Sequence, residues 1–376
     1  FLQDAWDNHV IDNEILDNGG VGLTVTGEFS NNNEIRGNEL INNLDGSIKL
    51  EVSAQSFVID NTLNNGLIID SGDGFNTITQ NIMSNEFGES VIAVIHDAEQ
   101  NTITENVISN ALVNGILLET ANNLLDLNNI SDVPRGISII DTSLNLISNT
   151  VIYDISTGIY VIGAQNINVT GMDVRDALAN GVYFNETTNS GVHNSFGDIY
   201  LDGSSNNLIR NNTGCIELHE SPNNILRRNN MSGCPKGVGI RKSSANSIAD
   251  NLMENNEVGA VFVESTLNQV FDNKVKSNKI GIFLNGSGAA ATSGLFGFFA
   301  KSATSNLVYN NFFENDLNAQ DDGFNNWNIT LTPGTNIVNG SFLMNIFPVL
   351  IFPLLSFVTI ITLFVVLYFS NNWSFV

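Results

Sequence analysis

A repeated asparagine pattern constrains this 376-residue chain more than any other feature. Residues 76–85 read NTITQNIMSN and residues 101–110 read NTITENVISN. The unit is Asn-x-Ile-x-x-Asn-x-Ile-x-x-Asn, followed by a turn and a Gly-Ile-x-Leu piece, at steps that cluster near 22 residues. Further copies begin at Asn33, Asn123, Asn145, Asn166, Asn207, Asn224, Asn246, Asn268 and Asn306. A fixed period of this length is typical of a solenoid, in which each repeat stacks on its neighbours.

Each unit predicts short β-strands, because its apolar residues alternate at period two over three to five positions before a turn intervenes. No segment before residue 342 keeps a 3.6-residue apolar period, so no helix is expected there. The pattern therefore predicts an all-β, right-handed, single-stranded parallel β-helix with three sheets. Roughly fourteen coils, each rising about 4.8 Å, would form a rod of about 65 Å. A leucine-rich repeat, whose period overlaps this one, is the competing fold, but its leucine signature and its helical half are absent.

The asparagines have two predicted roles at the corners of the coils. Asparagine tolerates the left-handed backbone region better than other non-glycine residues. Its side-chain amide can also bond to the equivalent amide one coil above and below, which forms a ladder. The predicted ladder residues are Asn76, Asn81, Asn101, Asn106, Asn123, Asn145, Asn246 and Asn268.

The charge of the chain excludes one class of partner. Asp and Glu number 39 against 14 Lys and Arg, which gives a formal net charge of -25. A protein that binds the phosphate backbone needs a basic face, so no nucleic-acid partner is expected.

The C-terminal end differs from the rest of the chain. Residues 342–369 carry no charge and are long enough to span a bilayer as a helix, although Pro348 and Pro353 interrupt their first half. The expected organisation is a β-helix over residues 1–340, a transmembrane helix over 342–369 and a short tail over 370–376. The lipid bilayer is thus an expected partner, with the body extracellular or periplasmic. The chain begins at Phe1 inside patterned sequence, so a leader has been removed or the N-terminal cap lies upstream.

The repeats resemble the parallel β-helix repeats of the NosD-like family, also called the carbohydrate-binding and sugar-hydrolysis domain, within the pectin-lyase-like superfamily. The resemblance covers residues 8–340 and is sharpened at residues 318–328, NAQDDGFNNWN. NosD-like proteins of archaeal cell surfaces often close their last coil with a segment of this kind. The resemblance implies a carbohydrate ligand, and it also carries an association with copper, for which the sequence offers no ligand cluster.

Breaks in the repeat mark the candidate ligand sites. The longest step separates Asn268 from Asn306 and contains an insertion with an aromatic tip, where Phe296, Phe298 and Phe299 could stack on sugar rings or fold back over the last coils. Basic residues gather between residues 210 and 242. Arg210 and Arg227 are predicted to stack on one face, and with Arg228 they form a short basic strip suited to a uronate or sulfated glycan, unless nearby glutamates pair with them.

Cys215 and Cys234 lie in neighbouring copies of the repeat. Equivalent positions in a solenoid stack about one strand spacing apart, which falls within the range that a disulfide accepts. A disulfide between them and a pair of stacked reduced thiols are both compatible with this placement.

The evidence for catalysis is weak, although polysaccharide lyases and glycoside hydrolases share the predicted fold. Asp321 and Asp322 are the best candidates for a carboxylate pair, but turn or Ca²⁺-binding roles explain them better, and no cofactor other than Ca²⁺ is suggested. The leading hypothesis is a membrane-anchored cell-surface protein that binds glycan or forms part of the envelope. A lyase or hydrolase, and a copper-related periplasmic maturation factor, are the alternatives.

Overall fold

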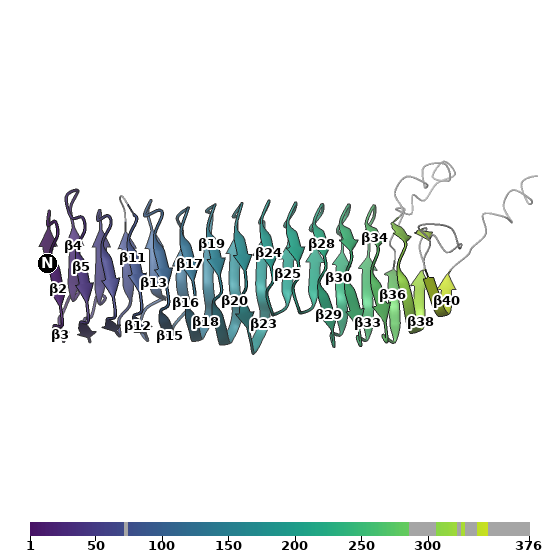
Figure 1. Ribbon diagram of the computed structural model, residues 1–376, viewed down its shortest axis with the longest axis horizontal. Coiled ribbons are helices and arrows are strands. Elements are labelled where there is room, and N and C mark those ends of the chain that lie inside the picture. Colours follow the sequence, from purple (N-terminus) through teal and green to yellow (C-terminus); the bar gives the residue numbers. More distant parts are fainter. Residues whose placement is uncertain (71–73, 286–305, 322–324, 328–336, 345–376) are drawn as a thin grey trace, which may run out of the picture.

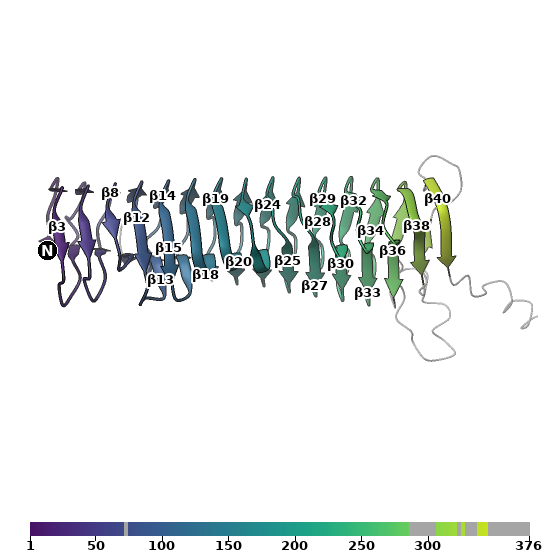
Figure 2. The same cartoon turned by 90° about the horizontal axis from the view of Figure 1, so that it is seen from below.

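The protein is a rod formed by one continuous spiral of short strands (Figures 1 and 2). A computed structural model describes residues 1–70, 74–285, 306–321, 325–327 and 337–344. All pairings between named strands in these residues are parallel, and the described residues contain no helix. The right-handed parallel β-helix predicted from the repeat is confirmed, and the leucine-rich alternative is excluded for this part of the chain.

The first sheet contains one short strand from each coil, fifteen among the described residues, which makes fourteen steps along the rod. Its strands are β2 (His9–Ile11), β5 (Glu34–Arg36), β8 (Phe57–Ile59), β11 (Thr77–Thr79), β14 (Thr102–Thr104), β17 (Leu124–Asp126), β19 (Leu146–Ser148), β21 (Asn168–Thr170), β24 (Gly191–His193), β26 (Leu208–Arg210), β28 (Ile225–Arg227), β31 (Ser247–Ala249), β34 (Gln269–Phe271), β37 (Leu307–Tyr309) and β39 (Asn326–Trp327).

The second sheet bends around a corner of the rod and therefore has two arms. Its near arm contains β3 (Glu14–Leu16), β6 (Glu39–Ile41), β9 (Thr62–Leu63), β12 (Ile82–Asn85), β15 (Val107–Ala111), β22 (Asp173–Val174), β29 (Asn230–Ser232), β32 (Leu252–Glu254) and β35 (Lys274–Lys276). Its far arm contains β1 (Leu2–Gln3), β4 (Leu23–Thr26), β7 (Ile48–Glu51), β10 (Leu67–Asp70), β13 (Ser90–Ile95), β16 (Asn114–Leu118), β23 (Ala177–Asn185), β25 (Ile199–Asp202), β27 (Ile216–His219), β30 (Lys236–Arg241), β33 (Val258–Val263) and β36 (Ile280–Asn285). Long strands cross the corner and belong to both arms: β18 (Asn129–Ile140), β20 (Val151–Ile162), β38 (Phe312–Asp321) and β40 (Ile337–Met344). The three predicted stacks of strands are present, but the near arm and the far arm form one continuous sheet.

The core is a column of aliphatic side chains that runs the length of the rod. In the first sheet each central residue points inward while its two neighbours point outward, as the period-two pattern requires. Ile78, Ile103 and Leu125 are stacked in register and fully buried. A single unit could not bury these faces, so the stacking of coils stabilises each of them.

Two asparagine ladders run along the corners of the first sheet. In ladder one, the Asn76 side-chain amide donates to Asn101 Oδ1 over 3.1 Å and the Asn101 amide donates to Asn123 Oδ1 over 3.1 Å. Asn145, Asn246 and Asn268 belong to the same ladder. Asn81 and Asn106 belong to ladder two, where their amide-to-oxygen distance is 3.0 Å.

The backbone role predicted for the ladder asparagines was wrong. The left-handed conformation falls on the residue before each of them, with φ of 57° at Phe75, 59° at Gln100 and 61° at Asn122. The ladder residue itself faces inward, where its amide satisfies backbone groups. The repeat copy predicted at Asn166 is one residue out of place, because the ladder position is the buried Ile167.

A column of glycines lets the coils approach one another on the far arm. A Cβ added at Gly259 would lie 2.5 Å from the carbonyl oxygen of Gly281 in the next coil, and one at Gly136 would lie 2.6 Å from that of Gly158. Such contacts do not occur in real proteins, so only glycine fits these positions. This explains the Gly-Ile-x-Leu piece of the repeat.

Candidate functional site

A stack of aromatic rings lies on the outward face of the far arm. Tyr160, Tyr183 and Tyr200 occupy the same register position on β20, β23 and β25. Their ring centroids are 5.3 Å and 5.5 Å apart, with nearly parallel planes. The Arg135 guanidinium covers the outer face of Tyr160, 4.0 Å from the ring centroid, which is a cation–π contact. Tyr200 is the last ring of this stack.

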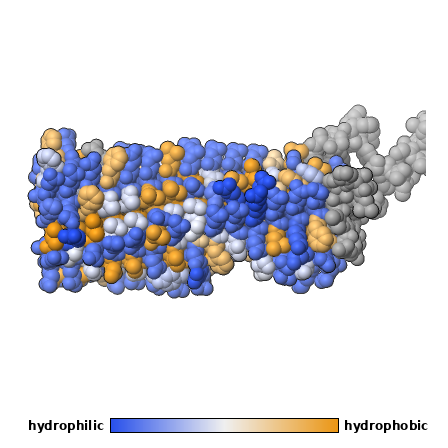
Figure 3. Space-filling model, in the orientation of Figure 1, coloured by the Kyte–Doolittle hydropathy of each residue, from blue (hydrophilic) through white to orange (hydrophobic). Residues whose placement is uncertain are grey.

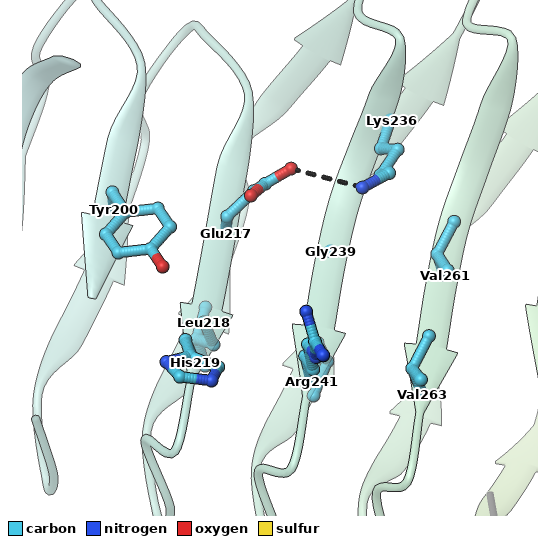
Figure 4. A pocket seen from close by; sticks show the side chains of 10 residues that line it. Tyr200, Glu217, Leu218, His219, Lys236, Gly239, Arg241, Val261 and Val263 are labelled. Atoms are coloured by element: carbon cyan, nitrogen blue, oxygen red, sulfur yellow. Dashed lines mark ion pairs between the residues drawn. The ribbon is translucent and has the colours of Figure 1, made fainter. Parts of the chain in front are cut away.

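A hollow of about 340 Å³ opens beside Tyr200 (Figure 4). The next two residues at the register position of the tyrosines are Glu217 and Gly239. Gly239 has no side chain to fill the surface there, and a Cβ at this position would lie 3.2 Å from Glu217 Cγ. The full lining is Tyr200, Glu217, Leu218, His219, Lys236, Gly239, Ile240, Arg241, Val261 and Val263. We call this set the hollow.

Most charged groups in the hollow have a partner. Lys236 Nζ lies 3.6 Å from Glu217 Oε1, and His219 Nδ1 lies 2.9 Å from Asp202 Oδ1. Arg241 is exposed and stands in register beside His219. Within the part of the chain that the structure describes, Arg241 makes no ion pair, so its guanidinium remains available to a ligand.

The hollow lies in the most basic part of an acidic rod. Residues 210–242 contain six Lys and Arg against two Glu, whereas the whole chain carries a net charge of -25. On the face shown in Figure 3, apolar residues gather over the N-terminal half of the rod, and the C-terminal half is mostly hydrophilic. Because Lys and Arg outnumber Glu in residues 210–242, an anionic group near the surface is least repelled around these coils.

Burial raises the pKa of two tyrosines in the stack. It raises the pKa of Tyr183 to about 12, with a further contribution from the carboxylate of Asp202. The pKa of Tyr200 is also raised, by burial first and then by Asp202 and Glu217, while Arg241 acts in the opposite direction. Both phenols are thus neutral hydrogen-bonding groups at physiological pH.

These shifts predict a late alkaline transition. Because the pKa of Tyr183 is raised to about 12 in the folded state, its contribution to stability is present below pH 10 and disappears as the pH rises towards 12. Phenolate absorbance is expected to show Tyr183 ionising at least one pH unit later than an exposed tyrosine. The Tyr183→Phe variant should lack this late step; an unchanged titration curve in that variant would contradict the assignment.

The basic strip predicted from the sequence lies on a different face. Arg210 and Arg227 are in register on β26 and β28 of the first sheet, and Arg228 follows at the corner with a φ of 57°. Arg227 Nε donates to Asp250 Oδ2 over 2.8 Å, so part of its charge is already compensated. Arg210 stands next to His193, whose pKa is lowered by burial and then by this arginine.

Hydrogen bonds hold the side chain of Asp321 in place at the last described coils. Its Oδ1 accepts a hydrogen bond of 2.8 Å from the Asn325 amide, and its Oδ2 accepts one of 2.8 Å from Trp327 Nε1. The indole of Trp327 also packs against Phe313 in the core. The Asp321 carboxylate, at the end of β38, is thus linked to Asn325 and to Trp327 of β39, the first strand of the next coil.

Several predicted residues lie outside the described part of the chain. These are Asp322, the aromatic tip with Phe296, Phe298 and Phe299, and residues 345–369 of the predicted membrane span. The strand β40 ends at Met344, so residues 342–344 belong to the β-helix backbone and not to a helix. The described residues include no helix that could cross a membrane.

Cys215 and Cys234 form a disulfide with a Cα–Cα distance of 5.8 Å. Neither thiol is therefore available as a metal ligand. Across the described residues, no three His, Cys, Asp or Glu side chains are grouped in a way that could hold a metal ion.

The described coils define a right-handed parallel β-helix protein. The family model described as "Periplasmic copper-binding protein (NosD)" matches residues 128–344, and a model described as "Right handed beta helix region" matches residues 58–196. The chain belongs to the NosD family, as the resemblance of its repeats predicted. No match was found among curated proteins.

Similar solved structures are distant in sequence. The Dettilon tailspike protein is 13% identical over 68% of this chain and 60% of its own, with a TM-score of 0.47. DFA-IIIase from Arthrobacter chlorophenolicus is 12% identical over 80% of this chain and 90% of its own, with a TM-score of 0.44. The A-module of the Azotobacter vinelandii mannuronan C-5 epimerase AlgE4 is 12% identical over 80% and 89%, with a TM-score of 0.40. Nothing about the chemistry of this chain follows from similarities of this size.

Proposed function

We propose that this protein binds an acidic glycan in the hollow, with a sugar ring against Tyr200 and an acidic group on Arg241. The observation that carries the proposal is the exposed Arg241, which has no ion-pair partner among the described residues and lines the same hollow as Tyr200, two strands away. An aromatic ring offers an apolar face that suits the C–H face of a sugar. A guanidinium recognises a carboxylate or sulfate through two parallel hydrogen bonds.

The other lining groups suit a saccharide. Glu217 and His219 present acceptors and donors, and Val261 and Val263, on the strand next to Gly239 and Arg241, provide an apolar side (Figure 4). A few convergent polar groups over an apolar surface are typical of small-molecule sites. The neutral phenol of Tyr200 adds a donor whose proton is retained by its raised pKa.

We place the body outside the cytoplasm, as a component of the periplasm or cell surface. The family description names a periplasmic protein, and a disulfide persists in oxidising compartments. Anchoring by residues 345–369 remains part of this proposal, on the basis of their uncharged, apolar sequence.

The proposal is tested by measuring the affinity of the full chain for neutral and uronate-containing oligosaccharides. Arg241→Gln is expected to weaken uronate binding about tenfold, because it removes one charge-assisted contact. Arg210→Gln/Arg227→Gln is the matched control on the first sheet and should change the affinity less than about twofold. Equal losses in both variants, or loss only in the control, would place the ligand elsewhere.

One observation favours an enzyme as the second candidate. His219 Nδ1 lies against Asp202 Oδ1. The other ring nitrogen, Nε2, lies 3.8 Å from Glu220 Oε1, on the ring that lines the hollow. A histidine oriented by a carboxylate can serve as a general base. Mass spectrometry of the same oligosaccharides after incubation decides: intact ligands support a binding protein, and shortened or unsaturated products support a lyase or hydrolase.

A further inference from the structure

We propose that the Cys215–Cys234 disulfide positions the rim of the hollow. It keeps Glu217 paired with Lys236, so that Arg241 remains available to the ligand. This inference rests on the proposed function of the hollow. It assigns the two cysteines as positioning residues of that site, in addition to any effect of the bond on stability.

The bond lies where the coil length changes. Asn207 and Asn224 are 17 residues apart in ladder one, whereas Asn224 and Asn246 are 22 apart. Thr213 and Asn230 form a bridge between these coils, and Ile216 pairs with Val238 just beyond it. The longer coil therefore places its five extra residues between Asn230 and Val238, a stretch that includes the turn with Cys234 before β30.

The two cysteines are hydrogen-bonded to opposite neighbours. The Cys215 N–H donates to Asp198 Oδ1 over 2.8 Å, which ties it to the preceding coil. The Cys234 N–H donates to Asn256 Oδ1 over 2.8 Å, and its carbonyl accepts from Glu257 N–H over 3.1 Å, which ties it to the following coil. At this corner the disulfide is the covalent link between the short coil and the long one.

The ion pair in the hollow crosses the same two coils. Glu217 lies two residues after Cys215, and Lys236 lies two residues after Cys234. Their side chains are about half exposed, at 45% and 50%, and exposed ion pairs contribute little free energy. The attraction alone is therefore too weak to fix the turn, and we assign that role to the disulfide.

Reduction is then expected to change the charge balance of the hollow. Without the bond, the turn that contains Cys234 and leads into Lys236 loses its link to Cys215, and the Glu217 carboxylate becomes free to approach Arg241. An intramolecular carboxylate on Arg241 competes with the acidic group of a glycan. Ligand affinity should therefore fall, although the coils on either side remain paired.

A double-mutant cycle tests the inference with four full-length proteins and a tetramer of galacturonic acid as the probe. The proteins are the unmodified chain, Cys215→Ser/Cys234→Ser, Lys236→Met and the triple variant. Loss of the disulfide should weaken binding about tenfold in the unmodified chain and less than about twofold when Lys236 is already absent, because coupled residues are not additive. Unchanged affinity without the disulfide, or an equal loss in both backgrounds, overturns the inference.

A second readout needs no ligand, so the two proposals can fail separately. Glu217 contributes to the raised pKa of Tyr200, so release of this carboxylate should lower the pH at which Tyr200 ionises, with Tyr200→Phe identifying the signal. If the unmodified chain binds no acidic glycan, the proposed function is wrong. The titration of Tyr200 then still tests the positioning role of the disulfide. Should the serine variant not fold, phosphine reduction of the folded protein provides the same comparison; an unshifted titration contradicts the positioning role.

Discussion

Replacing Asn106 with leucine is expected to lower the free energy of unfolding by about 4 kcal/mol, since several buried hydrogen-bonding groups lose their partner together. Asn106 Oδ1 accepts from both the backbone N–H and the side-chain amide of Asn81, each over 3.0 Å. Its own amide donates to Ile78 O over 2.9 Å and to Asn128 Oδ1 over 3.0 Å. Leucine fills the volume but removes the acceptor of the Asn81 backbone N–H and the amide that donates to Ile78 O, in the core, where water cannot replace them.

Asn129 provides the matched control for this substitution. It is exposed and lies one residue after ladder two, on β18. Asn129→Leu should change the unfolding free energy by less than about 0.5 kcal/mol. Guanidinium unfolding followed by circular dichroism compares the two variants, with hydrogen exchange of the adjacent coils as a local measure. A loss below about 1 kcal/mol for Asn106→Leu would mean that the ladder contributes little.

Replacing Gly259 with alanine is expected to cost about 3 kcal/mol, although it adds a single methyl group. The new Cβ would lie 2.5 Å from the carbonyl oxygen of Gly281 and 2.9 Å from Val275 Cγ1. The oxygen belongs to the backbone of the next coil, so relief requires the two coils to separate and their hydrogen bonds to lengthen. The φ of Gly259 is not in the left-handed region, which makes the effect steric.

Gly19→Ala is the control, because a Cβ at Gly19 has nothing within 4 Å. It should leave the stability unchanged or raise it slightly, since alanine restricts the unfolded chain. Thermal unfolding of the two variants separates the predictions. Equal behaviour of Gly259→Ala and Gly19→Ala would show that the coils can part at little cost.

The regular coils could be predicted from sequence because ladder and core residues recur together. Asn76 and Asn101 each precede a Thr-Ile-Thr strand, and this coincidence fixes the register of both coils. The prediction failed at Asn166, where the asparagine signal shifts by one residue and Ile167 takes the inward position. When an apolar residue fills a ladder position, the sequence has no asparagine there to identify that position.

The hollow could not be predicted in the same way, because it depends on coil lengths. Tyr160, Tyr183 and Tyr200 are separated by unequal numbers of residues, yet they share one register position. One signal was present: Tyr160 follows Gly158-Ile159, and Tyr183 follows Gly181-Val182. Aligning the coils on this glycine piece would have stacked the two tyrosines. The neighbours of Lys236 and Arg241 depend on the change from short to long coils. The asparagine spacing showed this change but did not show where the extra residues fall.

An experimental structure of the full chain with a bound uronate oligosaccharide tests the account most directly. We expect a sugar ring against Tyr200 and a carboxylate within hydrogen-bond distance of the Arg241 guanidinium, with Glu217 still beside Lys236. A saccharide bound instead along Arg210 and Arg227 on the first sheet, with the hollow filled by solvent alone, would contradict it.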